Sequence, residues 1–232
     1  MIYIFAIFIL VSLVGLSFKN IKNIDNEALT LERTTMINGF FVGLVLFSHF
    51  NSYVITNSSI DSIYYFIFKM GQLMVTTFLF YSGYGIYESI KNKKNYINNF
   101  FKNRIVKLFV SVFLAIILYI VLNIIIGEEY SIKTILLSPI GLTSIGNSNW
   151  FIFATFCMYF SVLISFKIFK KDNLSALLLC LILSFGYIFL VMKFLGYPWW
   201  VDTILCFNAG MFFSYFKESI LCLLKNNYHY FL

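Results

Sequence analysis

A single histidine, His49, lies within an otherwise apolar stretch of the chain, residues 36–56. An ionisable side chain is costly to place inside a membrane, so residues of this kind are functional candidates by default. Imidazole titrates near neutral pH, which suits it to act as a general base or to relay an acyl group. The alternative interpretation of His49 is a neutral histidine that forms hydrogen bonds between helices.

Asn38 precedes His49 by eleven positions. In an α-helix, eleven steps of about 100° make three turns plus about 20°, so the two side chains would share one helix face. Their separation along the axis would be about 16 Å. A helix here would therefore connect the inner membrane surface, at Asn38, with the outer half of the bilayer, at His49.

Arg104 and Lys107 enter a later apolar stretch one helical turn apart, on one face of an α-helix. A phosphate-bearing donor on the cytoplasmic side would need such a pair of cations. The remaining positive charge of residues 90–107 fits membrane topology and attraction to anionic lipids.

Three further residues are predicted near the outer ends of spans. Lys69 either faces the helix bundle, with Asp202 as its most plausible partner, or extends its ammonium group to the outer headgroups. Trp150 ends a polar loop, Gly-Asn-Ser-Asn-Trp, that suits the lip of a sugar site. An interfacial tryptophan anchor is the alternative there.

The composition predicts one integral membrane domain over residues 1–232. Of the 232 residues, 60% are hydrophobic and 12% charged, whereas soluble domains have about 45–50% apolar and about 25% charged residues. Seven apolar stretches approach the ~20 residues that a helix needs to cross a bilayer. They are residues 2–18, 36–56, 63–87, 105–126, 150–169, 175–192 and 200–216. None alternates with a period of two, so we expect an all-α polytopic bundle of about seven spans.

The loops predict how this bundle is oriented. Lysine and arginine are abundant in alternate connections, such as residues 90–107, and scarce in the others. The positive-inside rule then places the N-terminus outside and the C-terminus in the cytoplasm of a plasma-membrane protein. Residues 2–18 have no basic residue before the apolar core and no small-x-small cleavage site, so we expect a retained extra span at 1–18.

Two partner classes are not indicated. The four cysteines are far apart, which favours free thiols over a metal site. No basic stripe interleaved with exposed aromatic residues suggests a nucleic-acid surface.

The motifs taken in order resemble the membrane-bound acyltransferase 3 family, which O-acylates cell-surface polysaccharides. The residues that carry the resemblance are 31–41 with 46–50, 78–86, 100–107, 149–151 and 199–203. Asn38 stands where the family has a basic residue eleven positions before the histidine, and Lys107 stands at the second position of its Arg-x-x-Arg segment. The resemblance covers residues 31–216. Because the family has roughly ten spans, we expect a fragment, a C-terminally truncated product or a degenerate member.

The resemblance implies an acyl-CoA donor, most simply acetyl-CoA, approached from the cytoplasm, with no bound cofactor. The acceptor would be a hydroxyl of a surface glycan or lipid-linked sugar, and membrane lipid surrounds the chain. His49 would be the catalytic residue. The donor side would comprise Arg104, Lys107, Asn38 and Tyr84, and the acceptor side Lys69, Trp150 and Asp202. A non-catalytic relative and a sugar or anion transporter are the alternative functions.

Overall fold

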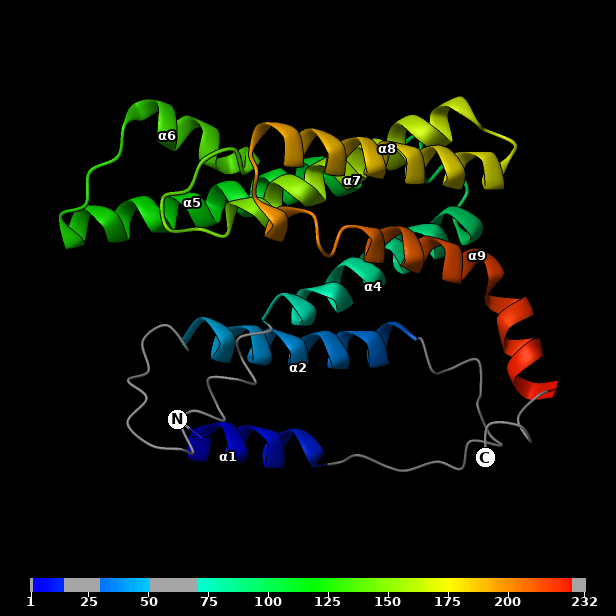
Figure 1. The fold of residues 1–232 in the computed structure, drawn as a ribbon, viewed down its shortest axis with the longest axis horizontal. Coiled ribbons are helices and arrows are strands. Elements are labelled where there is room, and N and C mark those ends of the chain that lie inside the picture. Colours follow the sequence, from blue (N-terminus) through cyan, green and yellow to red (C-terminus); the bar gives the residue numbers. More distant parts are fainter. Residues whose placement is uncertain (1, 15–29, 51–70, 227–232) are drawn as a thin grey trace. The chain divides into compact units, whose positions relative to one another are not determined.

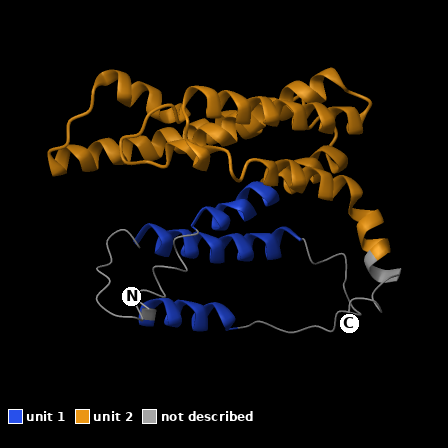
Figure 2. Ribbon diagram, in the orientation of Figure 1, with its two compact units in different colours: residues 1–81 blue, residues 82–232 orange. Residues whose placement is uncertain are grey.

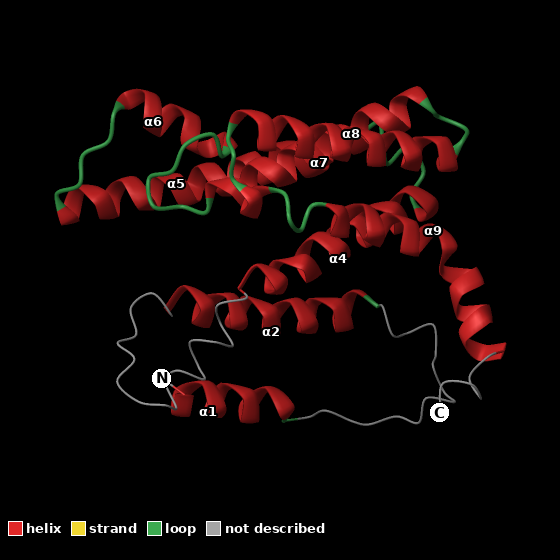
Figure 3. Ribbon diagram, in the orientation of Figure 1, coloured by secondary structure: helices red, strands yellow, loops and turns green. Residues whose placement is uncertain are grey.

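The computed structural model describes residues 2–14, 30–50 and 71–226. All regular structure in these ranges is helical, as Figures 1 and 3 show, which confirms the predicted all-α class. The α-helices are α1 (Ile2–Leu13), α2 (Leu31–Phe50), α4 (Gly71–Asn92), α5 (Lys107–Ile126), α6 (Ile132–Leu137), α7 (Asn149–Ile168), α8 (Asn173–Phe194) and α9 (Leu205–Asn226). The π-helix η4 (Phe101–Val106) leads directly into α5. Two short 3-10 helices are η5 (Ser138–Ile140) and η6 (Pro198–Trp200).

Three described helices are long and apolar enough to cross a membrane, judged by length and composition. They are α7, α8 and the continuous helix Phe101–Ile126, and they coincide with the predicted spans at 150–169, 175–192 and 105–126. Parts of the other predicted spans form α1, α2, α4 and α9. The total of about seven spans stays a prediction.

The last predicted span, residues 200–216, begins and ends later in the structure. Pro198 starts the 3-10 helix η6, and α9 begins only at Leu205. Proline fixes φ and has no backbone N–H, so it is tolerated in the first turn of a helix but not in the interior of one. Pro198 therefore begins a short helix of its own. At its other end α9 runs past the apolar stretch to Asn226 and thereby includes Lys217.

The chain divides into two compact units, residues 1–81 and residues 82–232 (Figure 2). Unit 1 is built on aromatic contacts between α1 and α2. The ring of Phe47 lies 5.4 Å from that of Phe5 and 5.3 Å from that of Phe8, measured between centroids. Gly43 faces the Phe8 ring so closely that a Cβ there would overlap it. A small residue at this position thus lets the two helices pack.

Unit 2 is centred on the antiparallel pair α7 and α8, with α9 against α8. Small and hydroxyl side chains line the contacts between these helices and form hydrogen bonds across them, as expected where water is excluded. Ser161 Oγ of α7 lies 3.2 Å from Cys180 Sγ of α8. Asn208 Nδ2 of α9 donates to Ser184 Oγ of α8 at 2.8 Å. The same unit holds Arg104, Lys107, Trp150 and Asp202.

Candidate functional site

Polar side chains gather in unit 2 where the second half of α4 lies against α9. Tyr84, Glu88 and Lys91 share one face of α4, because they are four and three positions apart. Ser214 and Lys217 stand one turn apart on α9. We call these five residues the α4–α9 cluster.

Glu88 is at the centre of this cluster. Its Oε1 accepts hydrogen bonds from Ser214 Oγ at 2.7 Å and from Lys91 Nζ at 3.1 Å. Lys91 Nζ also donates to the backbone oxygen of Ser214 at 3.1 Å. The carboxylate is thus held by both helices, and it neutralises Lys91.

Lys217 provides the second cation of the cluster. Its Nζ donates to Tyr84 Oη at 3.0 Å and lies 5.6 Å from the centroid of the Tyr84 ring. The hydrogen bond to Tyr84 is the largest cause that raises the pKa of Lys217, so the ammonium stays charged. No carboxylate of the described residues lies within ion-pair distance of this ammonium. Lys217 therefore retains charge with which to bind an anion.

Gly83 allows α4 and α9 to approach closely enough for these contacts. A Cβ at Gly83 would overlap the backbone carbonyl of Phe207 on α9. At Gly85, two residues further along, a Cβ would meet no atom within 4 Å. The Ser-Gly-Tyr-Gly segment thus contains one glycine that packing requires and one that it does not.

Glu88 lies just beyond the predicted span 63–87, and its environment makes stability depend on pH. Burial raises the pKa of Glu88, but hydrogen bonds from Ser214 and Lys91 and the charges of Lys91 and Lys217 outweigh burial and lower it overall. A lowered folded-state pKa contributes stability above the ordinary value of about 4.3, and this contribution is lost as pH falls through the folded-state pKa.

We therefore expect Glu88→Gln to lower the thermal unfolding midpoint of the purified protein at pH 7. As the pH falls, the midpoint of this variant should decrease less than the midpoint of wild type. The measurement is the unfolding midpoint from pH 7 to pH 3, with Glu128→Gln, in the exposed segment after α5, as the control. If Glu88→Gln follows the wild-type acid profile, the carboxylate does not have the role described.

Arg104 and Lys107 occupy different environments. Arg104 is half-buried in the π-helix η4, and its Nε donates to Tyr96 Oη at 2.8 Å. The Tyr96 ring lies against that of Phe100, which is fully buried. Lys107, the first residue of α5, is exposed. The π-helical turn between them is wider than the α-helical turn that the sequence predicted, and such turns often occur at functional sites.

His49 and Asn38 belong to unit 1. His49 is in the last turn of α2 and its side chain is exposed. Asn38 is half-buried on the same helix, and its amide oxygen is buried without a hydrogen-bond partner in the described part of the chain. A buried amide oxygen left unpaired is costly. The catalytic role of His49 stays a prediction.

The predicted acceptor residues are only partly described. Lys69 lies outside the described residues, so its pairing with Asp202 stays a prediction. Trp150 is half-buried in the first turn of α7, and Asp202 is exposed between η6 and α9. These two positions belong to the same end of unit 2, since the rings of Phe153 and Trp200 are 5.9 Å apart.

The family model described as an acyltransferase domain matches residues 35–222 of the chain. The chain belongs to the acyltransferase 3 family. The match contains every candidate residue named above and the whole α4–α9 cluster. No match was found among curated proteins or among solved structures.

Membership of the acyltransferase 3 family, together with the long apolar helices, supports membrane acyl transfer as the general class of activity. The sequence predicted roles for Arg104, Lys107 and Tyr84 but did not predict the partners of Arg104 and Tyr84. Five further residues that belong to the site were not predicted from the sequence, namely Glu88, Lys91, Ser214, Lys217 and Tyr96. The available signal was a lone glutamate at the end of an apolar stretch, where an unpaired charge would be costly.

Proposed function

We propose that this chain transfers an acyl group, most simply acetyl, from cytoplasmic acyl-CoA to a hydroxyl of a cell-surface glycan. The match of residues 35–222 to the acyltransferase domain carries this proposal. The α4–α9 cluster supports it, because a donor that bears several phosphates requires cations that are not already neutralised.

The donor end of the site would comprise Arg104, Lys107, Lys217 and Tyr84. Arg104 binds Tyr96 through Nε alone, so the other N–H groups of its guanidinium are not used by this contact. A guanidinium can bind phosphate oxygens in pairs. Lys217 is fixed by Tyr84 and adds a second point of attachment. Lys107 is exposed and would contribute charge. Asn38, whose amide oxygen has no hydrogen-bond partner among the described residues, would accept a hydrogen bond from the donor.

At the reacting end, His49 would take the proton from the acceptor hydroxyl as its oxygen attacks the thioester carbonyl. The bond from the carbonyl carbon to sulfur then breaks, and the CoA thiolate leaves. Alternatively the imidazole itself would attack the thioester and pass the acyl group to the hydroxyl. Lys69, Trp150 and Asp202 would orient the acceptor, which would approach from the outer side.

The donor assignment predicts a change in KM. Replacing Arg104 and Lys107 together with Gln is expected to raise the KM for acyl-CoA about tenfold or more, because each hydrogen bond to a charged group contributes about 1.5–3 kcal/mol. Lys217→Met is expected to raise KM in the same direction. Initial rates against acyl-CoA concentration in membranes measure the effect.

Lys94→Gln is the matched control, since Lys94 is exposed in the same basic segment and its loss lowers the positive charge there. The KM of this variant should stay within about twofold of wild type, as expected of an exposed charge without a specific contact. An unchanged KM in both the Arg104/Lys107 double variant and Lys217→Met would remove the donor role from this end of unit 2.

A further inference from the structure

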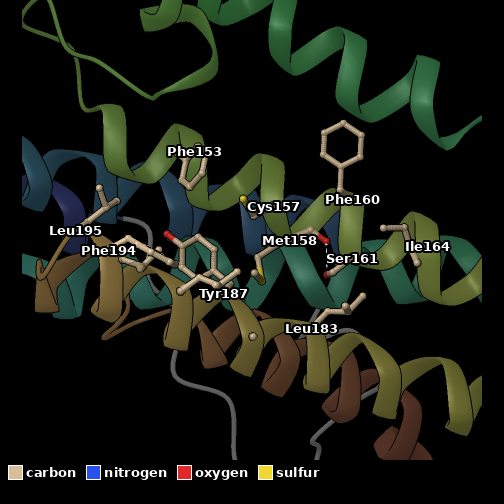
Figure 4. A pocket seen from close by; sticks show the side chains of 13 residues that line it. Phe153, Cys157, Met158, Phe160, Ser161, Ile164, Leu183, Tyr187, Phe194 and Leu195 are labelled. Atoms are coloured by element: carbon tan, nitrogen blue, oxygen red, sulfur yellow. Dashed lines mark hydrogen bonds between the residues drawn. The ribbon is translucent and has the colours of Figure 1, made fainter.

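An apolar groove of about 500 Å³ lies between α7 and α8 and is open along one side (Figure 4). On α7 it is lined by Phe153, Cys157, Phe160 and Ile164, whose spacing follows one face of the helix. Residues 183–194 of α8 form the facing wall. Neither the donor nor the acceptor assignment uses this groove.

The groove has the length of one leaflet. On each helix its lining extends over eleven helical steps, from 153 to 164 and from 183 to 194, which corresponds to about 16 Å along the axis. This is about half of the ~30 Å hydrocarbon core of a bilayer. A hydrocarbon chain lying parallel to the helices would extend along it.

The two hydroxyl groups that border the groove already donate hydrogen bonds to the protein. Ser161 Oγ donates to the backbone oxygen of Met158 at 2.7 Å. Tyr187 Oη donates to the backbone oxygen of Trp200 at 3.2 Å. A sugar or another polar solute would find no free hydroxyl there and would lose its hydration, whereas a hydrocarbon chain would not.

The groove is held open by Gly186. A Cβ at this position would meet no atom within 4 Å, so the space over Gly186 is not filled by any described side chain. A larger side chain here would enter the groove without displacing the protein around it.

A cation stands at one end of the groove. Lys193 Nζ lies 5.6 Å from the ring centroid of Phe194, which lines the groove, and 5.8 Å from that of Phe189. Among the described residues no carboxylate is within ion-pair distance of Lys193. The end of the groove thus offers a positive charge without a negative partner in the described part of the chain.

We propose that the α7–α8 groove binds a bilayer phospholipid with a net negative headgroup. One acyl chain lies along the groove over Gly186, and the headgroup phosphate lies at Lys193. The charge of Lys193, the length of the groove and its bonded hydroxyls together select this ligand. The assignment does not depend on acyl transfer, so it can fail or hold independently of the proposed enzymatic function.

The test is photocrosslinking of the full chain in vesicles that contain a trace of phosphatidylglycerol or of phosphatidylcholine, each with a photoreactive acyl chain. We expect adducts with phosphatidylglycerol to concentrate on residues 153–164 and 183–194. Lys193→Gln should reduce the phosphatidylglycerol yield about fivefold, as expected for one lysine near an anionic surface, and leave the phosphatidylcholine yield unchanged.

Gly186→Leu should reduce the yield for both lipids, whereas Leu178→Phe, at an exposed position of α8 outside the groove, should change neither. Because Lys193 is exposed, Lys193→Gln keeps the test valid even if Gly186→Leu fails to fold. Adducts spread evenly over α5, α7 and α8, or an unchanged yield in Lys193→Gln, would overturn the proposal. Displacement of the probe by a polyprenyl phosphate but not by unlabelled phosphatidylglycerol would overturn the choice of ligand.

Discussion

Replacing His49 with alanine is expected to lower acyl transfer by about 10²- to 10⁴-fold, the contribution that a positioned general base makes to a reaction. His49 is the single histidine of the predicted span 36–56, and the proposed chemistry requires a group there that accepts a proton from the acceptor hydroxyl. The measurement is transfer of labelled acetyl from acetyl-CoA to envelope glycan by membranes that contain equal amounts of each variant.

A second substitution distinguishes the two interpretations of His49. Glutamine can still form hydrogen bonds between helices but cannot take up a proton at neutral pH. His49→Gln should therefore be as inactive as the alanine variant if His49 is a base or an acyl relay. Phe50→Ala, at the neighbouring exposed position, should remain active and inserted. Full activity of His49→Gln would show that the histidine has only a structural role.

The largest effect on stability is expected at Gly83. Because a Cβ at Gly83 would overlap the backbone of Phe207, Gly83→Ala must push α4 and α9 apart. Overpacking of a well-packed contact costs about 1–3 kcal/mol or more, and here the obstructing group is backbone, which cannot rotate away. The same displacement would separate Lys217 from Tyr84 and Glu88 from Ser214, so the KM for acyl-CoA should rise as well.

Gly85→Ala is the matched control, since the same change two residues away meets no atom within 4 Å. Alanine also favours the helix over glycine by about 1 kcal/mol, so this variant should be as stable as wild type or more stable. Thermal unfolding of both purified variants in one detergent compares them. Equal unfolding midpoints for the two alanine variants would contradict the close packing of α4 on α9.

The helices could be predicted from the sequence because of the constraint that a bilayer places on the backbone. A spanning segment must satisfy its own backbone hydrogen bonds, so a long apolar stretch has few alternatives to a helix. The stretch predicted at 150–169 became α7 at Asn149–Ile168. The start of the last helix was predicted less well, because the short 3-10 helix that begins at Pro198 ends at Trp200 and α9 begins only at Leu205.

The candidate site was readable only in part. Arg104 and Tyr84 stand out in the sequence because each belongs to a recognisable segment, Lys-Asn-Arg-Ile-Val-Lys and Ser-Gly-Tyr-Gly. Their surroundings do not, because Glu88 and Ser214 are 126 positions apart and only the packing of α4 on α9 joins them. The π-helical turn at Arg104 was also invisible, since an apolar stretch with period 3.6 predicts an α-helix.

Incubation of the full chain, inserted in membranes, with labelled acetyl-CoA and total cell-envelope glycan tests the central claim most directly. We expect the label to enter the glycan, to be released by mild base as an ester is, and to depend on His49. Absence of label from the glycan with correctly inserted protein would contradict the claim. Exchange of a sugar or small anion across vesicles without any acyl donor would instead identify a transporter.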